Sequence, residues 1–230
     1  MTRLTLMPMA AAIKPLLNRL VFYGIETCRG QLDDRTMRVR GGAGCGVSVH
    51  ALVTTPLERV VPELIAAGGR RVQHHAYRDE FAFGERVRLT IATAIGGAQD
   101  APETIAREYG VLLTTGVSLG ADSTVRISTI VPQLALLWMA HRAERAPLPE
   151  SIWIEDVIEI VLRRGEIMAD MAAAPAELQT LIARQTQAFV EADSCLRILR
   201  RALPDARHVP ALAIRARERF RSLAARASPS

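Results

Sequence analysis

The stretch GGAGCGVSVHALV, residues 41–53, joins a glycine-rich turn to an apolar run and decides how the first half of the chain is organised. The apolar run predicts a β-strand over Val47–Val53. Backbone amides in such a turn can form a nest that binds an anion such as phosphate. The turn fits neither the GxGxxG nor the GxxxxGKS/T pattern, so a flexible turn or a close-packed start of the strand is the alternative interpretation. The candidate binding residues are Gly41, Gly42, Gly44, Gly46, Ser48 and His50.

Further strands and helices are predicted on both sides of this strand. A helix is expected over residues 56–67, because the segment TTP is typical of a helix start and a Gly-Gly pair follows its end. Residues 86–93 alternate apolar and polar side chains, the period of a half-buried strand, whereas residues 70–77 are ambiguous. A short helix ends near residue 109, and the segments VLLTTGVSL and STVRIST then read as strands. Before the glycine turn, apolar residues at helical spacing predict an amphipathic helix over Met9–Tyr23.

After Ile130 the apolar periodicity becomes helical. Helices are predicted in the segments VPQLALLWMAHRAER, SIWIEDVIEIVLRRG, PAELQTLIARQTQAFVEADSCLRILRRAL and VPALAIRARERFRSLAARA. Strands therefore come early and helices late, which is the order of an α+β protein. We predict a small mixed β-sheet flanked by helices, followed by a C-terminal helical region, with an α+β domain over residues 1–130 and the helical region over residues 131–230.

Composition places the chain among ordered globular proteins. It has 230 residues, of which 49% are apolar, so a substantial core can form. The three cysteines form neither a CxxC pair nor an even-numbered framework, which predicts reduced thiols and a cytoplasmic protein. The N-terminus has the outline of a short signal peptide, but its helical spacing favours an amphipathic helix. No apolar run reaches the roughly 18 residues of a transmembrane helix.

Positive charge is concentrated at the C-terminus. The formal net charge of the chain is +5, and residues 196–230 hold nine arginines against two acids. A basic helix of this kind can bind RNA, DNA or an anionic membrane. The alternative is a solvated helix whose apolar edge packs on the helical region. The candidate nucleic-acid-binding residues are Arg215, Arg217, Arg219 and Arg221.

Two further groups of residues point to structural roles. Trp138 and Trp153 lie on predicted helices, where large aromatic side chains are expected to anchor the core. Glu155 and Glu159 share a helix face at i, i+4, which favours a solvated face or one paired with arginine.

The order of these elements resembles the minimal nucleotidyltransferase fold, of the small kind found in bacterial abortive-infection toxins and antibiotic-modifying nucleotidyltransferases. The matching segments are GGAGCG, VSVHALV, the helix 56–67, RVRLTIA, VRISTIVPQLALLWMA and IEDVIEIV. The resemblance spans residues 13–161, and its clearest segments are apolar patterns. It implies a nucleotide-binding protein of a bacterial cytoplasm, in a toxin–antitoxin setting, with a protein partner encoded in the same operon.

The chain departs from that family at the positions of its catalytic acids. The family carries Asp-x-Asp on the first of these strands, and here the pair aligns with Ser48 and His50. A third acid is expected within residues 87–91, which include Arg88 and no carboxylate. Since Mg²⁺ prefers charged oxygen ligands, it would bind only if carboxylates came from elsewhere. The acids in predicted loops nearby are Asp33, Asp34, Asp79, Glu80 and Glu85.

We therefore expect a nucleotidyltransferase-like protein that has lost metal-dependent catalysis and binds a nucleotide, a nucleic acid or a protein partner. Whether transfer activity is retained stays open, and no catalytic residue or metal ligand can be assigned. The alternative is a non-enzymatic interaction module that binds nucleic acid through its arginine-rich C-terminal helix. A third class is a helical partner protein from an operon-encoded pair.

Overall fold

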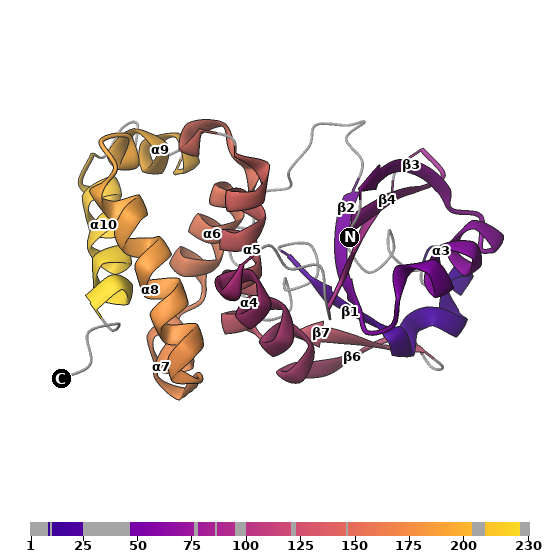
Figure 1. The fold of residues 1–230 in the computed structure, drawn as a ribbon. Coiled ribbons are helices and arrows are strands. Elements are labelled where there is room, and N and C mark those ends of the chain that lie inside the picture. Colours follow the sequence, from indigo (N-terminus) through magenta and orange to yellow (C-terminus); the bar gives the residue numbers. More distant parts are fainter. Residues whose placement is uncertain are drawn as a thin grey trace. The chain divides into compact units, whose positions relative to one another are not determined.

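The structure, a computed structural model, describes residues 9, 11–24, 47–75, 78–85, 87–94, 100–120, 123–145, 147–203 and 210–225. The chain divides into two compact units, with the boundary between Thr129 and Ile130 (Figure 1). The strands lie in the first unit, and the second is built from helices.

A seven-stranded mixed sheet forms the centre of the first unit. Its strand order is β3-β4-β5-β2-β1-β7-β6. The central strand β2 runs antiparallel to β1 and parallel to β5, and β1 runs parallel to β7. The prediction of a mixed sheet flanked by helices is confirmed at this level. The strands are β1 (Leu20–Tyr23), β2 (Val47–Val53), β3 (Arg70–His75), β4 (Arg78–Phe83), β5 (Val87–Thr93), β6 (Thr114–Gly120) and β7 (Ser123–Ser128).

One face of the sheet carries the hydrophobic core of this unit. On β2, Val49, Ala51 and Val53 belong to the core cluster. The 3₁₀ helix η1 (Lys14–Arg19) and helix α3 (Leu57–Ala66) contribute apolar side chains to the same cluster. Because side chains alternate along a strand, the other residues of β2 point to the opposite face. The core face therefore decides which residues of β2 are available for binding.

Helix α4 (Ala101–Leu112) lies against part of that opposite face (Figure 1). Ser128 Oγ donates a hydrogen bond to the Gly110 carbonyl at 2.6 Å. Arg126 Nη2 donates to the Val111 carbonyl at 3.1 Å. Both donors come from β7, so these bonds fix the C-terminal end of α4 over the β7 side of the sheet.

Three sequence-based predictions are wrong in this unit and the next. The segment Leu20–Tyr23 is a strand rather than the end of a helix over Met9–Tyr23, because it is buried throughout between β2 and β7. Residues 78–83, predicted as a loop, form β4, with Phe81 in the core. The long helix predicted from residue 175 is interrupted, because the backbone of Ala192 is extended. The ambiguous residues 70–75 form the edge strand β3.

The second unit is helical, as predicted, and its core is partly aromatic. Trp138 and Phe189 have ring centroids 6.0 Å apart, and Phe189 and Phe220 are separated by 5.1 Å. Trp138 and Trp153 are both buried, which confirms their expected role. No helix among the residues that the structure describes is long and apolar enough to cross a membrane. The elements are α5 (Ile130–Glu144), η4 (Leu148–Glu150), α6 (Ile152–Arg163), α7 (Ile167–Ala173), α8 (Ala176–Glu191), α9 (Cys195–Ala202) and α10 (Pro210–Ala224).

The sequence left the two glutamates of α6 either solvated or paired with arginine, and the structure shows them paired. Glu155 Oε1 lies 3.0 Å from Arg201 Nη2 of α9. Glu159 Oε1 lies 3.1 Å from Arg163 Nε, one turn further along α6. Both acids therefore serve ion pairs within the second unit.

Candidate functional site

Polar side chains gather on the sheet face opposite the core, over β2, β5, β4 and β3. In the register of β2 and β5, Ser48 lies opposite Arg88, and His50 lies opposite Thr90. β4 places Glu80 opposite Thr90 on the other side of β5. Directly paired residues of neighbouring strands point to the same face, so these side chains share one surface. We call it the polar face, and its polar residues include Ser48, His50, Arg70, Gln73, Arg78, Glu80, Arg88 and Thr90.

His50 is the buried member of the polar face. It is 9% exposed, and its ring centroid lies 5.6 Å from that of Tyr23, its partner on β1. Burial, and then the positive charge of Arg78, lowers the pKa of His50 to about 4. Burial likewise raises the pKa of Tyr23 to about 12. Both side chains are therefore neutral at pH 7 and supply hydrogen-bonding groups without charge.

The charge of the polar face comes from its arginines. Arg70 and Arg78 are exposed, and Arg88 is half-buried. Within the described ranges none of the three forms an ion pair, and the buried Nη1 atom of Arg88 has no hydrogen-bond partner. Among the described residues Glu80 is the carboxylate on this face, so with His50 neutral the described side chains of the face sum to +2. This surface favours an anion.

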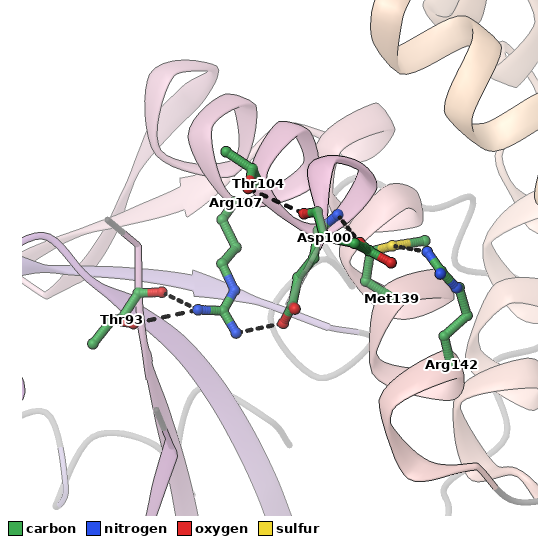
Figure 2. Close-up of polar contacts among 7 residues, drawn as sticks. Thr93, Asp100, Thr104, Arg107, Met139 and Arg142 are labelled. Atoms are coloured by element: carbon green, nitrogen blue, oxygen red, sulfur yellow. Dashed lines mark hydrogen bonds and ion pairs between the residues drawn. The ribbon is translucent and has the colours of Figure 1, made fainter. Parts of the chain in front are cut away.

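Arg107 is a buried arginine beside the polar face whose charge is already compensated (Figure 2). Its Nη1 donates to the Thr93 carbonyl at 2.8 Å, and its Nη2 pairs with the Glu103 carboxylate of the same helix. Asp100 caps this helix, since its Oδ1 accepts the backbone N–H of Glu103 at 2.9 Å. Arg107 therefore joins α4 to the end of β5 and has a structural role.

The structure brings together some of the sequence-based candidates. Ser48 and His50 lie two residues apart on one face of β2, and Ser48 is exposed. Gly41, Gly42, Gly44 and Gly46 lie outside the described residues, so their assignment stays a prediction. Arg70 and Arg78 were missed, because placing them beside Ser48 requires the pairing of β3, β4 and β5.

Of the three acids predicted in the loop before β5, Glu85 lies in a turn there, whereas Asp79 and Glu80 lie on β4 and point to opposite faces of the sheet. Glu80 belongs to the polar face. Asp79 points to the core face and is 1% exposed. Its Oδ1 accepts hydrogen bonds from Arg71 Nε at 2.9 Å and lies 2.8 Å from His74 Nδ1. Asp79 is therefore occupied by β3 and does not reach the polar face.

The donor set of the polar face does not fit the Mg²⁺ ions that the family resemblance implies. Among the described residues there is no group of three or more His, Cys, Asp or Glu side chains that could hold a metal ion. Mg²⁺ requires several charged oxygen ligands, whereas the guanidinium of Arg88 lies opposite Ser48, where such ligands would be needed. Glu80 alone cannot supply this coordination.

Three of the four candidate arginines on α10 make contacts within the chain. Arg217 Nη2 donates to the Val190 carbonyl at 3.0 Å, and Arg219 Nη2 donates to the Arg164 carbonyl at 2.5 Å. Arg221 Nη1 pairs with Glu218 at 2.5 Å, whereas Arg215 is exposed. Since Phe220 of the same helix is fully buried, these contacts favour a packing role for α10. Nucleic-acid binding by the four arginines remains a prediction.

No protein-family model matches the chain, and a search of the curated proteins finds no match. Among solved structures, the chain is similar to the crystal structure of JHP933 from Helicobacter pylori. The two share 10% sequence identity with a TM-score of 0.47, over 98% of this chain and 90% of that chain. This likeness is too low to define the family of the chain.

Proposed function

We propose that this chain is a nucleotidyltransferase-like protein that binds a nucleotide on the polar face and does not carry out metal-dependent transfer. The observation that supports the proposal is the shared orientation of Ser48 and His50. They occupy the strand positions at which the resembled family carries its two acids, and they point to a surface with a positive charge. A nucleotide is the ligand that matches both the resemblance and the charge.

The chemistry of these two residues suits binding better than catalysis. The Ser48 hydroxyl is exposed and can donate a hydrogen bond to a phosphate oxygen. His50 has a pKa of about 4, which makes its imidazole a weak base for removing a proton from a ribose hydroxyl. The described residues of this face include no cluster of carboxylates to hold a metal ion that would activate the attacking group. These residues therefore favour binding of a nucleotide without transfer of a nucleotidyl group.

Calorimetric titration with ATP and a transfer assay test this proposal together. We expect ATP to bind, with affinity reduced in Ser48→Ala and His50→Gln and unchanged in Thr115→Ala, a substitution at an exposed position of the edge strand β6. Labelled nucleoside triphosphates with Mg²⁺ and RNA should give no transfer product. The proposal is overturned if ATP does not bind, or if transfer occurs and depends on Mg²⁺.

A further inference from the structure

We propose that Arg70, Arg78 and Arg88 form a phosphate-binding site, in which guanidinium groups take the place of metal ions. The ligand class is a nucleoside diphosphate or triphosphate, bound as the metal-free anion. This inference rests on the proposed function, because it assigns the ligand charge and the binding mode to the same face.

The strongest observation concerns Arg88. Its Nη1 atom is buried, and it has no hydrogen-bond partner in the described part of the chain. The side chain as a whole is half-buried, and an uncompensated guanidinium in such a position attracts an anion to the part of it that remains accessible. Ser48 lies directly opposite on β2 and is exposed, and neighbouring strands are about 4.8 Å apart. The hydroxyl and the guanidinium can therefore reach oxygens of the same phosphate group.

Arg70 extends this row across the sheet. Arg70 on β3 pairs with Ala82 on β4, and Ala82 pairs with Arg88 on β5. Ala82 between them is 3% exposed and carries no charge, so the two guanidinium groups are the charged groups of this row. Guanidinium groups bind phosphate oxygens in a bidentate manner, so Arg70 and Arg88 can bind successive groups in a chain of two or three phosphates. The row runs Arg70, Ala82, Arg88, Ser48.

Arg78 and Glu80 determine where on the polar face the phosphates lie. Arg78 pairs with Ala92, and its charge acts on His50, so it borders the other end of the face. Glu80 lies between Arg78 and Ala82 and repels phosphate. The phosphates are therefore placed on the Arg70–Arg88–Ser48 row, and Arg78 adds long-range attraction.

Magnesium should weaken this interaction. Free ATP carries about two more negative charges than its magnesium complex, and the three arginines are attracted to those charges. A metal-dependent nucleotide site would show the opposite response, because there the ion bridges the phosphates to carboxylates. The sign of the magnesium effect therefore separates the two kinds of site.

Calorimetry with the full chain in EDTA tests the proposal, using inorganic pyrophosphate, ATP, AMP and adenosine as probes. We expect ATP and pyrophosphate to bind more tightly than AMP, and AMP more tightly than adenosine. Arg88→Gln should weaken ATP and pyrophosphate binding about tenfold or more, with a smaller loss in Arg70→Gln and Arg78→Gln. The charge-matched control is Arg59→Gln, at an exposed position of α3, which contributes to the opposite face, and it should bind like the wild type.

The outcomes distinguish this inference from the proposed function. If ATP binds but the three arginine variants bind as tightly as the wild type, the inference is overturned and the proposed function stands. If pyrophosphate binds through Arg88 and the nucleoside adds no affinity, the phosphate site stands and the nucleotide assignment fails. Tighter binding with Mg²⁺, or Mn²⁺ binding that is lost in Glu80→Gln, overturns the metal-free site. Thermal unfolding of each variant checks its folding, and the exposed Arg70 gives a second test if Arg88→Gln does not fold.

Discussion

Asp79 and Glu80 are consecutive residues of β4, and their side chains lie on opposite faces of the sheet. Asp79 pairs in register with Ile91 of the core, where Arg71 and His74 contact its carboxylate. Glu80 pairs with Thr90 on the polar face. The same chemical group therefore stabilises the fold at one position and faces a candidate ligand at the next.

Asp79→Asn should destabilise the first unit by about 2–3 kcal/mol, because it removes the charge that compensates Arg71 from a site 1% exposed. Solvent screens part of this charge interaction, because the side chain of Arg71 is 35% exposed. Glu80→Gln, one residue away, should change the free energy of unfolding by less than about 0.5 kcal/mol. Urea unfolding followed by circular dichroism measures both. An equal loss of unfolding free energy in the two variants would contradict the placement of Asp79 on the core face and Glu80 on the polar face.

Acid should destabilise the protein through His50. The pKa of His50 is about 4 in the folded chain and 6.5 in the unfolded chain, so below pH 6.5 the unfolded state takes up the proton more readily. The free energy of unfolding should therefore fall as the pH drops from 6.5 towards 4, with His50 contributing about 2 kcal/mol of loss by pH 5. Urea unfolding at pH 7.5 and pH 5.0 measures this change. His50→Gln should remove this part of the pH dependence, and an unchanged slope in the variant would assign it to other groups.

Arg107→Met should destabilise the attachment of α4 to the sheet. Arg107 is 8% exposed, and its guanidinium bonds to the Thr93 carbonyl and to Glu103, so methionine leaves both without these contacts. We expect a loss of about 2 kcal/mol in the free energy of unfolding. Arg59→Met is the matched control, since Arg59 lies at an exposed position of α3 in the same unit. A control as unstable as Arg107→Met would contradict the assignment.

Phe220→Ala should destabilise the second unit by about 3–4 kcal/mol, because it leaves a cavity next to Phe189. Ile214→Ala on the same helix should cost less than about 1 kcal/mol, since Ile214 is 52% exposed. Thermal unfolding of both variants measures the difference. If the two substitutions destabilise the protein equally, α10 is not packed through Phe220. The interpretation of α10 as a helix that binds nucleic acid would then be favoured again.

Elements with a clear period were predictable from the sequence, and elements without one were not. The strand Val87–Thr93 alternates buried and half-buried positions over most of its length, and the structure places it within one residue of the prediction. The strand Leu20–Tyr23 is buried at all four positions, so its sequence shows no alternation, and it was predicted as the end of a helix. β4 was missed because consecutive acids favour a loop, although one of them is neutralised inside the fold.

The candidate site was predictable only along one strand. The positions of Ser48 and His50 follow from the glycine turn and the family resemblance, both of which are visible in the sequence. Arg70 and Arg78 are separated from Ser48 by more than 20 residues, and only the pairing of three further strands brings them to its face. The register between strands that are distant in the sequence depends on the whole hydrophobic pattern, so it cannot be predicted from a local motif.

The short strand β1 is the only link between two groups of strands in this sheet, β3-β4-β5-β2 on one side and β7-β6 on the other, among the residues described. Val21 pairs with Arg126, more than 100 residues later in the chain. During synthesis, the edge of β1 that pairs with β7 therefore stays unpaired until β7 has been synthesised. Pairing between strands so distant in the sequence slows folding and exposes the nascent chain to aggregation. We therefore expect the protein to require a chaperone during expression.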